Sequence, residues 1–204
     1  AFGAGQTKTT AYLIPEESVD YWTDRLAAEG IDYEREQRFD ETVLRFSDPD
    51  GMDLELVAAD APSNAVPWAD SPVPEAHQPR GFYGVTLAVA DTDPTAEILT
   101  DVLGYSLERE ADGRRRYRSE AGGPGSVVDL VETDRDRGVM GVGTVHHVAF
   151  EAADREQQVA WREAFTERGL RVSSIIDRTY FESIYVREPG GILFEIATPD
   201  PGFA

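Results

Sequence analysis

Three segments of this 204-residue chain end in the same way, and this repetition constrains the fold more than any other feature. Each segment has a turn rich in Gly and Pro, followed by a short apolar stretch with one acidic residue inside it. These acidic residues are Glu55, Asp129 and Glu195. Turns of this composition join antiparallel strands. Because internal repetition sets the architecture, we expect one small unit to occur three times.

The same order of elements precedes each ending. A first strand is expected over residues 7–14, 82–90 and 144–151. A helix is expected over residues 16–29, 94–103 and 155–168. Glycines mark the C-terminal ends of the helices, and Asp154 with Gln157 resembles a capping box at the start of the third. Three further strands follow each helix. The fold class is therefore α+β, with repeated βαβββ units that form curved mixed sheets around a metal cup.

The spacing of the units predicts the domain organisation. Residues 1–62 are expected to form an unpaired βαβββ unit, and residues 63–80, which are rich in Pro, Ser and Ala, a linker. Residues 81–204 are expected to hold two paired units that carry the metal-binding strands, because only a short turn separates them. The chain begins without methionine at Ala1, and its first unit lacks a partner. Both features suggest a fourth unit upstream.

The charge of the chain limits its partners. With 39 acidic and 19 basic residues, the net charge is −20, which argues against nucleic acid and anionic membranes. No apolar run approaches the ~18 residues that span a membrane, and no signal-peptide pattern is present, so we expect a cytoplasmic protein.

The acidic surface is also poor in lysine, since Lys8 is the only one. Such a surface is expected of a halophilic protein in a salt-rich cytoplasm, where the Debye length falls to ~3 Å at 1 M salt. An acidic mesophilic protein is the alternative. The chain has no cysteine, so any bound metal is held by nitrogen and oxygen.

A histidine and a carboxylate on apolar strands form the candidate metal site. By strand alternation His147 shares a face with Val145 and Ala149, and Glu195 shares one with its own strand neighbours. Together they supply two of the three ligands of a facial triad, which leaves positions open on iron(II). Such groups are costly to bury unless they are paired or bound to metal. A strand histidine in an ordinary core or surface environment is the alternative.

Two further side chains lie near this site in the sequence. The turn before the last strand places Tyr185 opposite Glu195 or next to it. A phenol there can hydrogen-bond a substrate and act as an acid or base. Arg178 can hold an anionic substrate oxygen, or it can pair on the surface with Asp177 or Glu182.

The other two units lack this pair of residues. Thr9 and Gly84 stand where the third unit has His147. We therefore interpret Glu55 and Asp129 as remnants of the repetition rather than as metal ligands.

The βαβββ repeats resemble the vicinal-oxygen-chelate superfamily, which includes glyoxalase I, bleomycin-resistance proteins and extradiol dioxygenases. Two stretches are more specific and resemble the hydroquinone-type ring-cleaving dioxygenases. They are Gly143-Thr-Val-His-His-Val-Ala-Phe150 and Asp177-Arg-Thr-Tyr-Phe-Glu-Ser-Ile-Tyr-Val-Arg-Glu-Pro-Gly-Gly-Ile-Leu-Phe-Glu-Ile-Ala-Thr198. The resemblance runs through the whole chain, but its decisive motifs lie in the last 60 residues.

The resemblance implies that His147 and Glu195 bind iron(II), with manganese(II) as the alternative. It also implies that His146, Tyr185 and Arg178 line the substrate pocket. Simple alternation turns His146 away from the face of His147, so a twist or bulge would have to bring it near.

The resemblance leaves the remaining ligand unassigned. The family's other histidine lies on the first strand of a unit that would precede this chain. Related catechol enzymes place it where this chain has Gly84, and His77 in the linker is a poor candidate. A separate segment is therefore expected to supply it, either upstream in the same protein or in a homo-oligomer.

These features predict an iron(II)-dependent dioxygenase that opens a hydroquinone- or catechol-type ring with O2. Its partners would be a small aromatic substrate and O2. One alternative is a metal-free protein that sequesters aromatic compounds, as bleomycin-resistance proteins do. Another is a glyoxalase-like isomerase, although the paired glutamates that this reaction uses are not evident.

Overall fold

The computed structural model describes residues 2–60, 63, 65–123 and 125–202. Residues 61, 62 and 64 of the boundary and linker region, and residue 124 of the second Gly/Pro turn, lie outside this description.

Three βαβββ units follow one another along the chain, as the repetition predicts. The first unit contains β1 (Gln6–Ile14), a 3-10 turn (Glu16–Ser18), α1 (Val19–Ala28), β2 (Tyr33–Arg38), β3 (Glu41–Ser47) and β4 (Asp53–Ala58). The second contains β5 (Phe82–Val89), α2 (Asp93–Asp101), β6 (Tyr105–Ala111), β7 (Arg114–Ser119) and β8 (Val127–Glu132). The third contains β9 (Val148–Glu151), α3 (Arg155–Glu167), β10 (Ile176–Asp177), β11 (Glu182–Arg187) and β12 (Leu193–Ala197). The α+β class and the repeated unit are confirmed.

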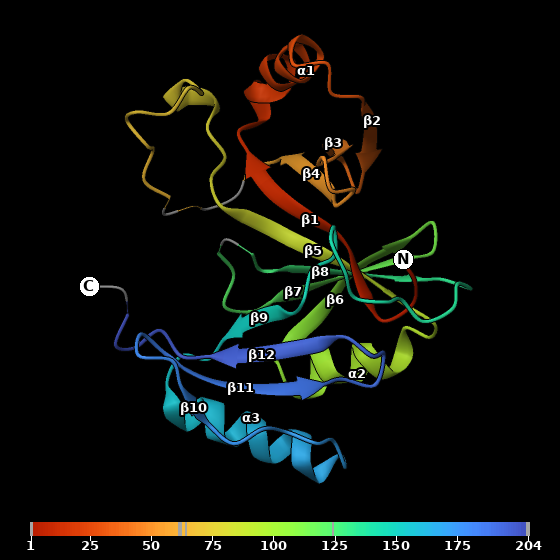
Figure 1. Cartoon of the computed structure of the whole chain (residues 1–204), viewed down its shortest axis with the longest axis vertical. Helices are drawn as coiled ribbons and strands as arrows, with labels where there is room; N and C mark the ends of the chain where they lie inside the picture. Colours follow the sequence, from red (N-terminus) through yellow and green to blue (C-terminus); the bar gives the residue numbers. More distant parts are fainter. Residues whose placement is uncertain (1, 61–62, 64, 124, 203–204) are drawn as a thin grey trace.

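The strands form two mixed sheets (Figure 1). The larger has the order β2-β3-β4-β1-β5-β8-β7-β6, in which β1 is parallel to β4 and antiparallel to β5. The first unit is thus continuous with the second and is not unpaired, which corrects the expected organisation. The third unit forms its own sheet, in the order β10-β11-β12-β9, with β9 at an edge. Sequence proximity did not reveal this pairing, because it depends on which strand edges meet in space.

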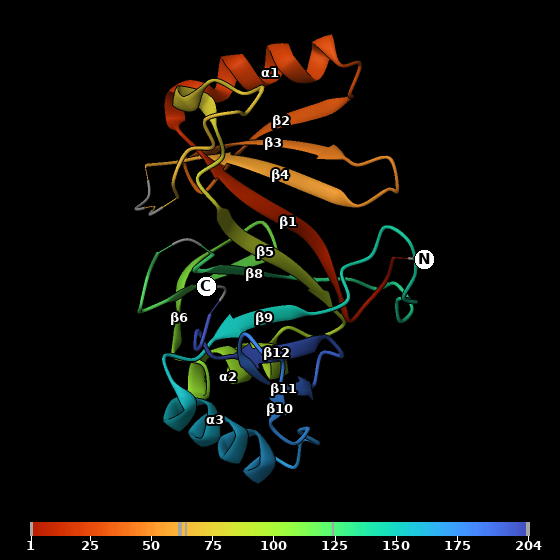
Figure 2. The same cartoon turned by 60° about the vertical axis from the view of Figure 1, so that its left-hand side comes forward.

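The second and third units are joined by packing instead of by a shared sheet. One buried cluster contains Leu87 and Leu130 of the second unit together with Phe165 and Phe194 of the third. The side chain of Thr95 in α2 also donates a hydrogen bond of 2.7 Å to Glu188 in the β11–β12 turn. Burial raises the pKa of Glu188, even though Thr95 and backbone N–H groups favour its charged form. Figure 2 shows α2 and α3 beside the smaller sheet, at the opposite end of the molecule from α1.

The linker folds back onto the first unit. It contains a 3-10 turn, Glu75–His77, and the indole of Trp22 donates a hydrogen bond of 2.9 Å to the carbonyl of His77. The ring of His77 stacks on Tyr21 with centroids 4.4 Å apart. The linker histidine therefore packs against α1.

The strand expected over residues 144–151 begins four residues later, at Val148. Its pairing with β12 starts there, since Phe194 lies opposite Val148. Residues 144–147 belong to no sheet, so His146 and His147 precede β9 and are free of strand alternation.

The N-terminus of α3 is fixed by side-chain caps, as Asp154 and Gln157 predict. The carboxylate of Asp154 accepts a hydrogen bond of 2.8 Å from the backbone of Gln157. The Gln157 side chain in turn accepts one of 2.8 Å from the backbone of Ala153.

Replacing Asp154 with Ala should lower the free energy of unfolding by about 1 kcal/mol, because a backbone donor of α3 loses its partner. Urea denaturation of both proteins measures this change. Glu163→Ala, at an exposed mid-helix position, is the control and should change stability by less than about 0.5 kcal/mol. Equal losses in the two variants would contradict a capping role.

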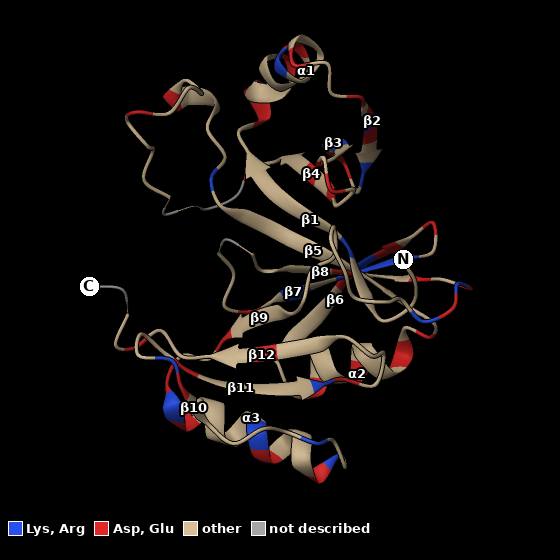
Figure 3. Cartoon of the chain, viewed as in Figure 1, with Lys and Arg blue, Asp and Glu red and all other residues tan. Residues whose placement is uncertain are grey.

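Acidic residues are spread over the helices and loops instead of being confined to one element (Figure 3). Among the described helices, none is both long and apolar enough to cross a membrane.

Candidate metal centre

His147 and Glu195 meet at the boundary between β9 and β12. The Nε2 atom of His147 lies 2.7 Å from the Oε2 atom of Glu195. Two ligands bound at about 2.1 Å and at right angles on one ion lie about 3 Å apart, so this separation fits two ligands of a shared ion. Glu195 is only 4% exposed, whereas His147 is half-buried and accessible from outside.

Tyr185 lies directly opposite Glu195 in the β11–β12 pair, as the turn register predicts. Its hydroxyl donates a hydrogen bond of 2.7 Å to Oε1 of Glu195. Each carboxylate oxygen therefore has a different partner, the phenol on one side and the imidazole on the other. The rings of His147 and Tyr185 meet edge to face at 5.8 Å.

Ser173 fixes the backbone of Tyr185 from the neighbouring segment. Its hydroxyl accepts a hydrogen bond of 3.0 Å from the Tyr185 amide, and its own amide donates one of 3.0 Å to the Tyr185 carbonyl. This contact could not be predicted from the sequence, because Ser173 lies outside any regular strand.

His146 lies beside His147, although strand alternation predicts the opposite side. The Nδ1 atoms of the two imidazoles are 3.0 Å apart, and the rings meet edge to face. The reason is the late start of β9, which leaves both histidines in irregular backbone. His146 is exposed beside His147.

Arg178 lies over Tyr185. Its guanidinium donates a hydrogen bond of 3.2 Å to the tyrosine hydroxyl and lies 5.5 Å from the ring centroid. The two carboxylates considered as surface partners are otherwise engaged, since Asp177 accepts from the Thr179 amide and Glu182 pairs with Arg155. Arg178 therefore belongs to the group around Glu195.

The turn after Arg178 is strained. Thr179 has a φ of 73°, a left-handed conformation that a β-branched residue rarely adopts. Such strain is concentrated at functional sites, where the surrounding structure holds it in place. Here it accompanies the turn that presents Arg178 to Tyr185.

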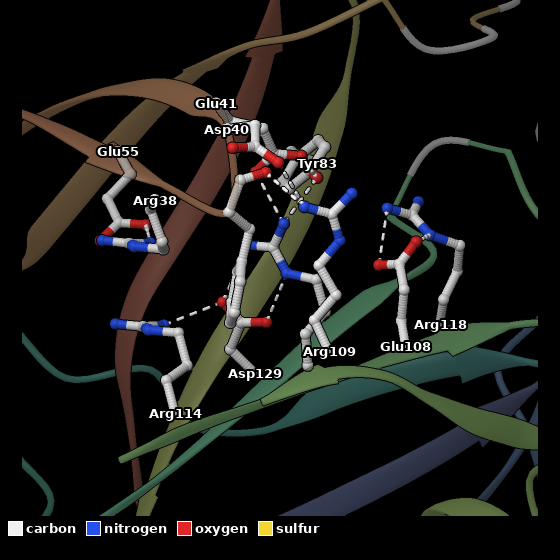
Figure 4. A network of polar contacts seen from close by, with 12 residues as sticks. Arg38, Asp40, Glu41, Glu55, Tyr83, Glu108, Arg109, Arg114, Arg118 and Asp129 are labelled. Atoms are coloured by element: carbon white, nitrogen blue, oxygen red, sulfur yellow. Dashed lines mark hydrogen bonds and ion pairs between the residues drawn. The ribbon is translucent and has the colours of Figure 1, made fainter. Parts of the chain in front are cut away.

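The equivalent positions in the other two units carry different chemistry. Strand register aligns Glu55 and Asp129 with Glu195, and places arginines where the third unit has Tyr185: Arg45 lies opposite Glu55, and Arg116 lies opposite Asp129. Figure 4 shows Arg38 against Glu55 and Arg114 against Asp129.

Guanidinium groups neutralise these two carboxylates. Arg38 makes two hydrogen bonds to Glu55, of 2.8 and 2.9 Å. Arg116, which is 2% exposed, makes two to Asp129, of 2.8 and 3.0 Å, and one of 2.6 Å to Glu41. Burial disfavours the Arg116 cation, but the contacts with Asp129 keep its pKa above the ordinary value. Of these three carboxylates, all in the described part of the chain, only Glu195 faces an imidazole.

The sequence model of the glyoxalase/bleomycin resistance protein/dioxygenase superfamily matches residues 82–196, which are more than half of the chain. The chain belongs to this superfamily.

Similar members of the superfamily are longer than this chain. MhqO of Bacillus subtilis (strain 168), named as a candidate ring-cleaving dioxygenase, is 40% identical over 202 residues, which cover 99% of this chain and 64% of MhqO. The chlorohydroquinone/hydroquinone 1,2-dioxygenase of Sphingobium indicum is 32% identical over 201 residues, covering 95% of this chain and 62% of that protein. The crystal structure of a candidate dioxygenase from Bacillus subtilis superposes with a TM-score of 0.94 at 40% identity, covering all of this chain and 65% of that one. The chain thus spans less than two thirds of the length of these relatives.

The superfamily resemblance calls for a further metal ligand, and the described residues supply no group of three or more His, Asp or Glu that could hold a metal ion. His77 is occupied at α1, where its Nδ1 lies 3.0 Å from the Ser18 hydroxyl. Gly84 cannot be a ligand position in this fold, since even a Cβ atom there would lie 2.3 Å from the Val127 carbonyl oxygen. The imidazole of His147 and the carboxylate of Glu195 fit a divalent metal that takes nitrogen and oxygen donors. A facial triad would need one more protein ligand.

Proposed function

We propose that this protein is an iron(II)-dependent dioxygenase that opens a dihydroxylated aromatic ring with O2, with His147 and Glu195 as metal ligands. The observation that carries the proposal is the 2.7 Å separation of their donor atoms beside Tyr185. When bound at such a site, iron(II) supplies open positions for the substrate oxygen and O2, and carries electrons between them. Manganese(II) is the alternative metal.

Tyr185 is suited to hold or move a proton. Its hydroxyl lies between the Glu195 carboxylate, to which it donates, and the Arg178 guanidinium, from which it accepts. A phenol in this position can exchange a proton with a substrate hydroxyl.

Arg178 and His146 would stabilise negative charge. Both side chains are exposed beside the half-buried Tyr185 and His147, on the side from which a substrate would approach. Donors arranged around a developing oxyanion lower the barrier, because their orientation is fixed before the reaction begins.

We propose that hydroquinones are preferred over catechols as substrates. The Sphingobium relative is named for chlorohydroquinone and hydroquinone, and the Bacillus relatives as candidate ring-cleaving dioxygenases. This chain spans less than two thirds of the length of these proteins. The proposed activity is therefore that of a protein that also contains the third metal ligand.

Oxygen uptake by the full-length protein tests the proposal. The protein is loaded with iron(II) without air and then mixed with aerated hydroquinone or catechol, while an oxygen electrode records consumption. We expect one O2 consumed per ring opened, with hydroquinone the faster substrate. Tight binding of hydroquinone by metal-free protein, with no uptake after loading, would instead identify a sequestering protein. Isomerisation of a hemithioacetal without O2 would identify a glyoxalase-like enzyme.

Replacing Tyr185 with Phe should lower kcat about 100-fold in iron-saturated protein, since the phenol hydroxyl serves proton transfer. Iron binding should weaken by less than it does on loss of a ligand, because the phenol only hydrogen-bonds Glu195. Steady-state kinetics and iron analysis measure the two quantities. Tyr33→Phe in β2, far along the chain from this site, is the matched control and should leave both unchanged. An unchanged kcat in Tyr185→Phe would remove Tyr185 from the proposed chemistry.

A further inference from the structure

Lys8, the only lysine of the chain, occupies an irregularity in the β1–β5 pair. Thr7 lies opposite Leu87 and Thr9 lies opposite Thr86, so Lys8 is an extra residue between two paired positions. Bulges of this kind re-aim a side chain and are frequent next to binding sites. Lys8 is half-buried, and within the described part of the chain its ammonium has no ion pair or hydrogen bond.

The carboxylates around Lys8 are already neutralised by arginines. Arg38 holds Glu55 through two hydrogen bonds. Arg45 holds Asp53 at 2.6 Å, and the Ser47 hydroxyl donates to the same carboxylate. Among the described residues the ammonium is therefore left without an ion pair, although Glu55 and Asp53 attract it.

The electrostatics of Lys8 agree with this picture. Burial lowers the pKa of Lys8, and repulsion from Arg114, Arg45 and Arg38 lowers it further, against the attraction of Glu55. A cation in these surroundings gains more from an anionic partner than one in open water would.

A pocket of about 230 Å³ opens beside Lys8. It is bounded by residues 7–10 of β1, by the β3–β4 turn and by residues 142–145. Thr9 lines it and is 3% exposed, yet its hydroxyl has no hydrogen-bond partner. That hydroxyl is fully buried within the described residues, so it stands behind the pocket wall. Asp50 and Asp53 also line the pocket.

We propose that this pocket binds a small oxyanion, a carboxylate or a phosphate, through the ammonium of Lys8. An ammonium acts as a point-charge donor that suits both anions. The neighbouring arginines disfavour a metal cation despite Asp50 and Asp53.

The pocket is connected to the proposed metal centre through the chain. Thr144 and Val145 line it and are followed directly by His146 and His147. Gly143 packs so closely on the β3–β4 turn that a Cβ atom there would lie 2.2 Å from the carbonyl oxygen of Asp50. A bound anion would therefore hold the segment that carries both histidines.

Anion binding can be measured by thermal unfolding in phosphate or acetate, each compared with chloride at equal ionic strength. The chloride arm is needed because salt alone stabilises a highly charged protein by screening. We expect phosphate or acetate to raise Tm above the chloride value with saturation, and the two arms show which oxyanion is preferred. Equal Tm values in all three salts would overturn the proposal.

Lys8→Gln should weaken the apparent affinity by about 10-fold or more, because it removes the charged donor. Arg171→Gln makes the same charge change at an exposed position and should leave affinity unchanged. Undiminished binding by Lys8→Gln would exclude Lys8 as the donor.

A second measurement needs no variant and remains valid if Lys8→Gln fails to fold. Cyanate carbamylates unprotonated amines, and peptide mapping identifies the modified Lys8 unambiguously, since the chain has no other lysine. Saturating phosphate or acetate should slow carbamylation of Lys8 several-fold relative to chloride. An unchanged rate with both anions would show that neither covers the ammonium.

Discussion

The His147→Ala variant of the full-length protein is expected to lose bound iron and O2 uptake together, with a rate at least about 10³-fold below that of the unchanged protein. Loss of an outer partner of a metal ligand already costs 10- to 100-fold in affinity or activity, so loss of a ligand costs more. Glu195→Gln should behave alike, because an amide keeps the shape of the side chain but not its charge. Iron analysis and oxygen uptake measure the two effects.

The matched control for the first prediction is His77→Ala. His77 also contacts a polar side chain, but it does so at α1 in the first unit. Its loss should leave iron content and O2 uptake unchanged. Uptake that survives His147→Ala, or is lost equally in His77→Ala, would contradict the assignment of His147 as a ligand.

The second large effect is expected at Arg116, in the unit that lacks a metal pair. Arg116→Leu should lower the free energy of unfolding by about 3–5 kcal/mol. Buried Asp129 keeps only its contact with Arg114, and half-buried Glu41 loses its arginine. Asp129 is 3% exposed and receives two of its hydrogen bonds from Arg116. Glu41 would lose a contact of 2.6 Å. Denaturation in urea at neutral pH measures the loss.

A second variant separates charge from packing in this prediction. In the double variant Arg116→Leu with Asp129→Leu, the unpaired carboxylate is gone, and apolar replacements of buried ion pairs are often neutral. The double variant should therefore regain at least about 1 kcal/mol relative to Arg116→Leu alone. Failure to regain any stability would indicate that Arg116 acts through its packing against neighbouring side chains.

Tyr83 belongs to the same network as Arg116 and helps to hold its charged side chains in place. Burial raises the pKa of Tyr83 to about 12, so the phenol stays protonated and donates to Glu41. It also accepts a hydrogen bond of 3.1 Å from Arg116. The network thus joins Tyr83, Arg116 and Asp129 of the second unit with Glu41 of the first unit.

The elements of the fold could be predicted from the sequence because local signals determine them. Gly51 and Gly191 occupy positive φ in two of the repeated turns, where glycine is favoured, and this fixes the hairpins. The cap at Asp154 is equally local. The joining of β1 to β5 was missed, because contact between strands of different units leaves no mark in either segment.

The sequence also predicted part of the grouping of side chains at the candidate site. His147 and Glu195 were found because both lie in apolar stretches, and Tyr185 because a tight turn fixes the register of its hairpin. The position of His146 was not predictable, since it depends on where β9 stops pairing.

The arginine network was missed for a different reason. Arg114, Arg116 and Arg118 alternate along β7 as solvent-facing residues commonly do, and arginine is seldom buried unless it is paired. Only the structure shows that the adjacent strand β8 supplies Asp129 and that β3 of the first unit supplies Glu41.

Within the described residues, β9 is an edge strand of the smaller sheet and pairs only with β12. By contrast, β1 and β5 pair with each other in the larger sheet. A further strand that docks along this free border would extend the sheet by hydrogen bonds alone, in the way that exposed strand edges recruit partners. Its alternate side chains would then project next to His147 and Glu195. Under the proposed function, extension of the sheet along β9 would bring a third donor to His147 and Glu195 without moving either residue.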